Sequence, residues 1–141
     1  MKVVVDANRL IAAMIRDGAS RSLLRSPFLE HYTPSFSFSS IEKYRGDIIL
    51  KAGISEEEFS LLIVMISRKV KVIPLDVYSI YLHVAINDLP DRGDVPFLAL
   101  GIAIGADAIW TDDKHFQHQT KVKVFTTKEL LEHLKKQKTP R

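Results

Sequence analysis

The chain has 141 residues, a net charge of +3 and no cysteine, so disulfides, thiol catalysis and cysteine zinc sites are excluded. Its length suits one compact domain, residues 1–141, and its apolar fraction of 46% is ordinary for a globular protein. No run approaches the ~20 apolar residues that a membrane helix requires. The first residues reach Asp6 before an apolar signal-peptide region forms, so we expect a cytoplasmic protein.

Short β-like runs alternate with helical stretches along the chain. In chain order, we expect a strand at 2–6, helices at 8–15 and 21–28, a strand at 31–35, helices at 40–51 and 59–69, a strand at 70–75, helices at 76–86 and 94–104, strands at 108–111 and 122–125, and a final helix from 126 or 127. This alternation predicts an α/β fold, a three-layer α/β/α sandwich around a central parallel sheet.

Particular residues mark the ends of several of these helices. Gly53 is a natural C-terminal glycine for the helix at 40–51. Ser55 and Glu58 have the spacing of a capping box ahead of the next helix, and Asp76 suits the start of the helix after the third strand.

The C-terminal segment 128–141 is expected to be a basic helix and tail. It holds five basic and two acidic residues, which account for the whole net charge of +3. Such a segment either holds phosphates through counterion release or is a solvated, frayed terminus.

Several carboxylates lie at the ends of predicted strands or at the start of a predicted helix. Asp6 ends the first strand, Asp94 opens the apolar helix, and Asp112 and Asp113 follow the fourth strand. Ligands of an open parallel sheet bind beyond the carboxyl ends of its strands. These side chains are therefore expected to meet in one crevice, with Glu42, on the helix after the second strand, as the remaining candidate.

Carboxylates grouped in this way suit Mg²⁺ or Mn²⁺, in a site of one or two ions. Each residue also has a structural interpretation. Asp6 suits a strand-end turn, Glu42 suits a capping box with Ser39, and Asp94 suits an N-cap. Asp112 and Asp113 suit a loop, and either of them can supply the fourth acid.

Three segments contain these carboxylates in recognisable motifs: Val3-Val4-Val5-Asp6-Ala7-Asn8, Asp91-Arg92-Gly93-Asp94-Val95-Pro96-Phe97-Leu98-Ala99-Leu100 and Gly105-Ala106-Asp107-Ala108-Ile109-Trp110-Thr111-Asp112-Asp113. They resemble the motifs of the PIN-domain family. A weaker match to the family's second motif is Ser39-Ser40-Ile41-Glu42. Their order and spacing extend the resemblance over essentially the whole chain.

The resemblance implies an Mg²⁺- or Mn²⁺-dependent endoribonuclease. It makes Asp6 and Asp94 the main metal ligands, with Glu42 and Asp113 completing the catalytic set. It gives supporting roles to Asn8, Asp91, Thr111 and Asp112. Many small members resemble VapC, the toxin of a toxin–antitoxin pair, so it also implies an RNA substrate, an antitoxin partner and a homodimer.

Other residues near the motifs have weaker functional interpretations. Lys43, Arg45 and Lys114 flank the acidic motifs, where they suit phosphate contacts or a solvated surface. His115 and His118 have the spacing of a metal pair, but we interpret them as surface residues because further zinc ligands cannot be named. Trp110 is expected in the core, and the apolar run 61–66 in the core or a dimer contact.

Two other classes of protein compete with the nuclease interpretation. A haloacid-dehalogenase-like phosphoryl-transfer enzyme would use Asp6 as its nucleophile, but it needs a second acid where this sequence has Asn8. The alternative within the same fold is a catalytically inactive PIN-fold RNA-binding or assembly module. All four acidic positions are filled, which favours the nuclease.

Overall fold

A computed structural model of the chain describes residues 1–138; residues 139–141, the end of the predicted basic tail, lie outside the described residues. Five strands form one parallel sheet in the order β3-β2-β1-β4-β5. They are β1 (Lys2–Val5), β2 (Glu30–Pro34), β3 (Val70–Ile73), β4 (Ala108–Trp110) and β5 (Val124–Phe125). The predicted parallel sheet is confirmed, with β1 at its centre.

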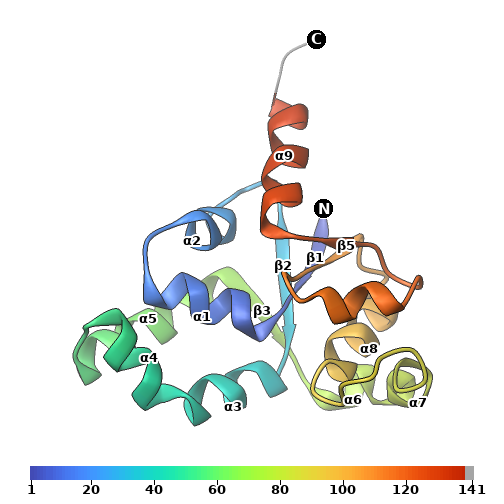
Figure 1. Cartoon of the computed structure of the whole chain (residues 1–141), viewed down its shortest axis with the longest axis horizontal. Coiled ribbons are helices and arrows are strands. Elements are labelled where there is room, and N and C mark those ends of the chain that lie inside the picture. The colour runs from blue at the N-terminus through green and yellow to red at the C-terminus, as the bar shows by residue number, and fades with distance from the viewer. Residues whose placement is uncertain (139–141) are drawn as a thin grey trace.

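Helices cover both faces of this sheet (Figure 1). One layer contains α1 (Ala7–Ile15), α2 (Ala19–Leu24), α3 (Phe36–Lys43), α4 (Arg45–Ala52), α5 (Glu56–Lys69) and α9 (Thr127–Lys138). The other contains α6 (Leu75–Tyr78), the 3₁₀ turn η1 (Ser79–Tyr81), α7 (Leu82–Ala85), α8 (Val95–Ile104) and the 3₁₀ turn η2 (Lys114–His118). The three-layer α/β/α arrangement is therefore confirmed.

The central strand explains why its sequence is a continuous β-branched run. Val3 and Val5 pack into the core under one helix layer, and Val4 packs into the core under the other. All three are fully buried, and burying one such side chain stabilises the fold by about 1.5–3 kcal/mol. A strand covered on both faces has no polar side to alternate with.

The predicted helix signals around α5 are confirmed. The Glu58 N–H donates to Ser55 Oγ at 3.1 Å and the Ser55 N–H donates to Glu58 Oε1 at 3.2 Å, which is a complete capping box. Gly53 has a φ of 64° after α4, a left-handed conformation that only glycine adopts without strain.

Three predicted helices differ from the observed ones. The helix predicted at 21–28 is α2 (Ala19–Leu24), which ends before Pro27 because a proline disfavours helical conformation in the residue that precedes it. The stretch 40–51, predicted as one helix, contains parts of two. α3 begins earlier, at Phe36, and a break at Tyr44 separates it from α4. Burial of Ile41 and Phe38 against the core holds this serine-rich turn in a helix despite its low propensity. Ser39 therefore lies inside α3, and the capping-box interpretation of Glu42 is wrong.

The stretch 76–86 is divided into α6, η1 and α7. Pro74 is the N-cap of α6, and Asp76 lies in its first turn instead of before it. Within residues 1–138, no helix is both long and apolar enough to cross a membrane.

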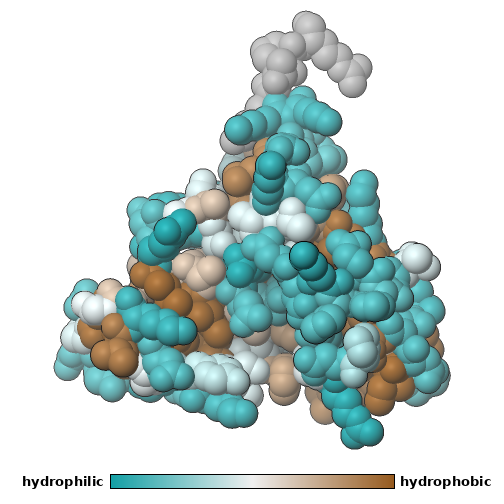
Figure 2. All heavy atoms as spheres, viewed as in Figure 1, coloured by the Kyte–Doolittle hydropathy of each residue, from teal (hydrophilic) through white to brown (hydrophobic). Residues whose placement is uncertain are grey.

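Apolar side chains on several helices stay exposed. Figure 2 shows them as separate hydrophobic patches over the helices of the α1–α5 side and over the α6–α8 side. On α5, Phe59 and Ile66 are buried in the core whereas Leu61 and Met65 are 64% and 55% exposed. The apolar run of α5 thus has one face in the core and another facing outward.

Candidate metal centre

The carboxyl edge of the sheet brings three distant parts of the chain together. Asp6 follows β1, Asp113 follows β4, and Asp94 stands at the first turn of α8. Beside them is a cavity of about 340 Å³ between α1, α3 and α8. It is lined by Asp6, Ala7, Asn8, Ile11, Phe36, Ser39, Ser40, Lys43, Tyr44, Gly93, Asp94 and Phe97.

Asp6 is held in a fixed orientation at the end of β1. It is only 5% exposed, and Thr111 Oγ1 donates a hydrogen bond to its Oδ2 at 2.7 Å. Burial raises the pKa of the Asp6 carboxyl, and the Thr111 hydrogen bond partly opposes this shift. The resemblance gave supporting roles to Asn8 and Thr111. Thr111 supplies the side-chain hydrogen bond, and Asn8, which lines the cavity, lowers the pKa of Asp6 through a backbone hydrogen bond.

Asp94 occupies the N-cap position of α8 without acting as a side-chain cap. Among residues 1–138, its carboxylate makes no capping hydrogen bond, and its buried Oδ2 has no hydrogen-bond partner. The residue is 9% exposed. An unpaired buried carboxylate is costly, so the N-cap interpretation does not explain this residue.

Burial also changes the pKa of the Asp94 carboxyl. Burial, followed by the negative charges of Asp113, Asp91 and Asp6, raises the pKa of the Asp94 carboxyl to about 7. Neighbouring carboxylates disfavour its ionised form, and a cation among them would favour it.

Asp112 and Asp113 are adjacent but have different partners. Asp112 accepts hydrogen bonds from the Thr127 N–H at 2.7 Å and Oγ1 at 3.0 Å, and it pairs with Arg9 Nη1 at 2.8 Å. These contacts connect the loop after β4 to the start of α9 and to α1. Asp112 is therefore turned away from the candidate site.

Asp113 is turned toward the other carboxylates. Its N–H donates to Thr111 Oγ1 at 3.0 Å, so one threonine hydroxyl orients both Asp6 and the Asp113 loop. Its Oδ1 accepts from the His115 N–H at 2.9 Å. The sequence left the fourth acid open between the two aspartates, and only Asp113 lies beside Asp94.

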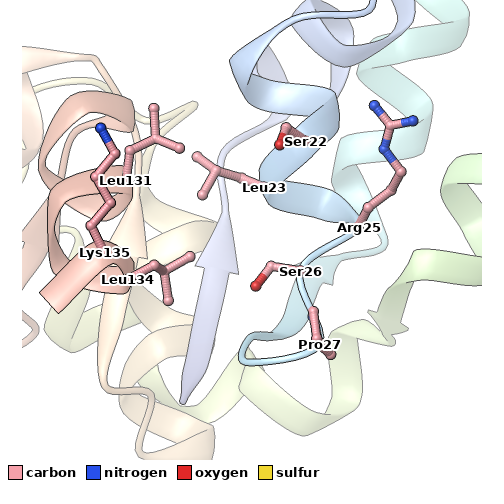
Figure 3. A pocket seen from close by; sticks show the side chains of 8 residues that line it. All are labelled: Ser22, Leu23, Arg25, Ser26, Pro27, Leu131, Leu134 and Lys135. Carbon is pink, nitrogen blue, oxygen red and sulfur yellow. The ribbon is translucent and has the colours of Figure 1, made fainter. Parts of the chain in front are cut away.

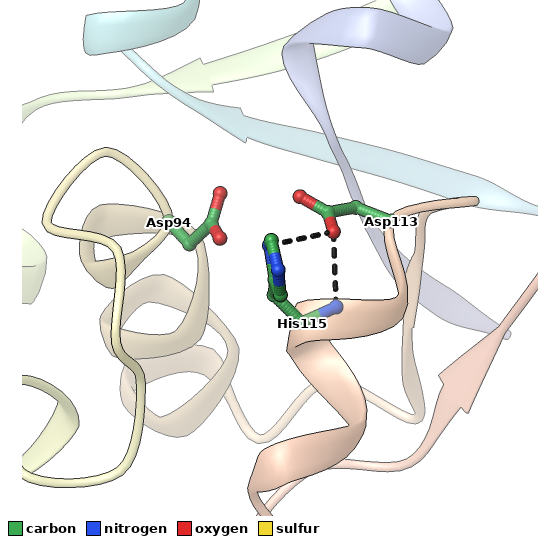
Figure 4. Close-up of side chains that lie close together, drawn as sticks. All are labelled: Asp94, Asp113 and His115. Atoms are coloured by element: carbon green, nitrogen blue, oxygen red, sulfur yellow. Dashed lines mark hydrogen bonds and ion pairs between the residues drawn. The ribbon is translucent and has the colours of Figure 1, made fainter.

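The structure places a histidine beside Asp94 and Asp113, in a tighter group to which Asp6 does not belong among the described residues. Ligand atoms of Asp94, Asp113 and His115 lie within 4.8 Å of one another, and Figure 4 shows the three side chains pointing toward one another from α8 and from the loop entering η2. His115 is exposed, as we expected from the sequence, but its proximity to Asp94 was not predicted. The available signal was its position two residues after Asp113, where the backbone turns around that carboxylate.

The structure does not bring Glu42 into this group. Its side chain is 57% exposed and lies 3.5 Å from Arg45 Nη1. Arg45 also pairs with Glu56 at 2.7 Å and lies over the Phe59 ring. The reason is helical phase. The cavity is lined by residues of α3 at i, i+3, i+4 and i+7, from Phe36 to Lys43, and Glu42 does not belong to that face.

The remaining predicted residues lie around the site. Lys43 lines the cavity, and Lys114 is exposed on η2. Asp91 Oδ1 accepts from the Gly93 N–H at 2.8 Å and thereby closes the turn before Asp94. Trp110 is fully buried in β4, as predicted, and its Nε1 donates to Thr127 Oγ1.

A second cavity of about 380 Å³ lies between α2 and α9. Figure 3 shows its lining, which includes Leu23, Leu131, Leu134 and Lys135. None of its lining residues among those described is acidic. It lacks the donor set of a cation site, so the carboxyl edge is the candidate functional site.

The fold and the site together define an α/β protein with a partly buried carboxylate cluster at the carboxyl edge of a parallel sheet. The PIN-domain sequence profile matches residues 4–135, so the chain belongs to the PIN-domain family. No protein of curated function matches the sequence.

A solved structure supports the same fold. A chain in the crystal structure of VapBC2 from Rickettsia felis, bound to a DNA fragment from their promoter, superposes with a TM-score of 0.69. The sequences are 11% identical, and the match covers 89% of this chain and 98% of that one. At this identity the likeness concerns the fold alone.

Proposed function

We propose that this protein is a metal-dependent endoribonuclease whose divalent ion is held by Asp94, Asp113 and Asp6. The observation that carries the proposal is the buried Oδ2 of Asp94, which has no hydrogen-bond partner among the described residues. A functional ligand explains an unpaired carboxylate at a helix start, whereas a structural role leaves its energetic cost unexplained. Membership of the PIN-domain family supports nuclease chemistry at this site.

A bound divalent ion would bind a phosphoryl oxygen and lower the pKa of an attacking water. The chain's own residues do the positioning. The Thr111 hydroxyl donates a hydrogen bond to Asp6 and accepts one from the Asp113 N–H, so it fixes these two residues relative to each other. The N–H of His115 orients Asp113 Oδ1. These contacts fix the donor atoms before any ion binds, which lowers the cost of assembling the site.

The cavity beside the carboxylates supports an unpaired nucleotide as the substrate unit. Phe36 and Tyr44, which are 42% and 46% exposed, offer aromatic surfaces to a base. Lys43 lies in the same lining and suits a backbone phosphate. Its volume of about 340 Å³ is that of a small-ligand pocket, so we propose single-stranded RNA as the preferred substrate. Glu42 is left outside the proposed ligand set.

We expect end-labelled single-stranded RNA to be cleaved in Mn²⁺ or Mg²⁺, to remain intact in EDTA, and to be cleaved again when metal is restored. The same sequence in a duplex should react at least about tenfold more slowly, because its bases are not free to stack in the cavity. The Asp94→Asn protein, purified in parallel, controls for contaminating nuclease.

The alternative, a catalytically inactive module that binds RNA, predicts a different outcome. Such a protein would retain RNA in a filter-binding assay but leave it uncut in every metal. A phosphoryl-transfer enzyme using Asp6 would instead become labelled by a phosphate donor. Either result would replace the nuclease proposal.

We further propose that the protein is a VapC-like toxin that forms a homodimer and is bound by an antitoxin. A groove of about 290 Å³ between α2 and α5 supports a protein partner. It combines apolar residues with cations and is lined by Ala13, Arg21, Leu24, Arg25, Leu62, Met65, Ile66, Arg68 and Lys69. This chemistry suits an acidic amphipathic segment.

Light scattering on the isolated protein and co-purification with the product of the adjacent gene test these assemblies. We expect the mass of a dimer and a stable complex. A monomer at micromolar concentration, with no complex, would contradict the proposed partners but leave the nuclease proposal intact.

A further inference from the structure

One donor at the proposed centre is a nitrogen, which the motif resemblance does not assign. His115 lies on η2, two residues after Asp113, and its Nδ1 is 3.2 Å from Asp113 Oδ1. A ligand atom of its ring belongs to the same 4.8 Å group as atoms of Asp94 and Asp113 (Figure 4). Two carboxylates and one imidazole therefore share one space.

The state of Asp94 indicates that this space is built for a cation. Asp94 is nine-tenths buried, and among residues 1–138 its Oδ2 has no hydrogen-bond partner. Figure 4 shows its carboxylate directed at His115 and Asp113. A cation between these groups would satisfy the orphaned oxygen and relieve the repulsion between the two carboxylates.

We propose that His115 is a direct ligand of the ion held by Asp94 and Asp113, and that the site consequently prefers first-row transition-metal ions over Mg²⁺. The inference rests on the proposed metal-dependent function and names the ion class for the same site. Imidazole nitrogen binds ions such as Co²⁺ and Ni²⁺ well, whereas Mg²⁺ strongly favours oxygen and retains its waters. A site with one nitrogen donor is therefore expected to bind transition-metal ions more tightly than Mg²⁺.

His118 provides a matched control on the same turn. Its ring stacks beside that of His115, with centroids 6.3 Å apart and planes 29° apart. Both residues are exposed, but among the described residues only His115 belongs to the ligand group. Removing either ring should have a similar, small effect on folding, and only removal of His115 should change metal selectivity.

A positioning role for His115 makes a different prediction. If the His115 ring only orients Asp113 through their 3.2 Å contact, its loss weakens the binding of all ions by a similar factor, since the same carboxylate binds each of them. If the ring binds the ion directly, its loss selectively weakens the binding of transition-metal ions. The ratio of the Co²⁺ and Mg²⁺ dissociation constants therefore distinguishes a ligand from an orienting neighbour.

Isothermal titration of the metal-free full chain with Co²⁺ and with Mg²⁺ measures this ratio, and the visible absorption of bound Co²⁺ reports nitrogen coordination. We expect His115→Ala to weaken Co²⁺ binding at least about tenfold and Mg²⁺ binding less than about threefold. The Co²⁺ spectrum should change in His115→Ala and stay unchanged in His118→Ala.

Equal weakening of both ions in His115→Ala, or none, with an unchanged Co²⁺ spectrum, would overturn the ligand assignment while the proposed nuclease centre stands. If the unsubstituted protein binds neither ion, the metal centre itself fails, and the ligand assignment fails with it. Circular dichroism of the three proteins confirms that they are folded when these comparisons are made.

Discussion

Asp94→Asn and Asp6→Asn are each expected to reduce metal-dependent RNA cleavage more than about 100-fold while the protein stays folded. The substitution keeps the shape of the side chain and removes the charge that holds the ion. Asparagine caps a helix about as well as aspartate, so a purely structural residue at either position would tolerate the change. Single-turnover cleavage in Mn²⁺, with circular dichroism on the same samples, measures both effects.

Neither variant should lose a hydrogen bond that stabilises the fold, although the two carboxylates have different surroundings. Asp6 accepts a hydrogen bond from Thr111, and an asparagine can keep that bond through its amide oxygen. Asp94 Oδ2 has no partner to lose among residues 1–138. Near wild-type cleavage by either variant would remove that residue from the ligand set, and near wild-type cleavage by both would end the nuclease proposal.

Asp94→Asn is also expected to stabilise the metal-free protein above pH 7. The folded-state pKa of Asp94 is about 7, above its ordinary 3.8. Between these values the folded state keeps a proton that the unfolded state has released, so the wild-type free energy of unfolding falls as pH rises through this window. Asparagine does not ionise, so the variant avoids this loss, which amounts to more than about 1 kcal/mol.

Thermal melts of the two metal-free proteins at pH 5 and pH 8 measure this difference. We expect the melting temperature of Asp94→Asn to exceed that of the wild type at pH 8 and to approach it at pH 5. Saturating metal should raise the wild-type value and leave the variant largely unchanged, since only a folded site binds the ion. A variant that gains stability and loses cleavage marks a residue kept for function.

Most of the fold could be predicted because sequence patterns within single strands and helices indicate the same burial and the same helix ends that the structure has. The run from Val3 to Val5 is apolar on both sides, and the structure buries both sides. The capping box of Ser55 and Glu58 depends only on residues close in sequence, as does the glycine that follows α4. Asp6, Asp94 and Asp113 converge because each follows or begins an element at the same edge of a parallel sheet.

The role of Glu42 depends on information that the sequence does not display locally. Which face of α3 a residue occupies is set by the helix as packed, and tertiary contacts of Phe38 and Ile41 extend that helix back to Phe36. The surface position of His115 was predicted, but its proximity to Asp94 was not, for a related reason. This proximity is a contact between α8 and the loop after β4, and spacing within one motif does not reveal it.

Substitution of the adjacent residues Asp112 and Asp113 should separate an effect on cleavage from an effect on stability. Asp113→Asn is expected to weaken cleavage more than about 100-fold with little change in stability. Its carboxylate faces Asp94 and His115, and its Oδ1 accepts from the His115 N–H, a bond that asparagine can preserve. The lost charge should therefore appear in metal binding and cleavage.

Asp112→Asn is expected to have the opposite profile. Its carboxylate accepts two hydrogen bonds from Thr127 and pairs with Arg9, and asparagine offers one acceptor oxygen in place of two. We expect a loss of about 1–2 kcal/mol in the free energy of unfolding and cleavage within about threefold of wild type, because the Asp112 carboxylate contacts Thr127 and Arg9 instead of the proposed ligand group. The loss stays moderate because Thr126 and Glu129 also cap the start of α9.

Urea unfolding and single-turnover cleavage of both variants at equal concentration decide between the two roles. Because the residues are neighbours and the chemical change is identical, differences in expression or general surface charge cancel in the comparison. Equal losses of cleavage would mean that Asp112 and Asp113 share the site. A larger loss for Asp112→Asn would mean that the loop after β4 is turned the other way when RNA and metal bind, with the Asp112 carboxylate inward and its hydrogen bonds to Thr127, at the start of α9, broken.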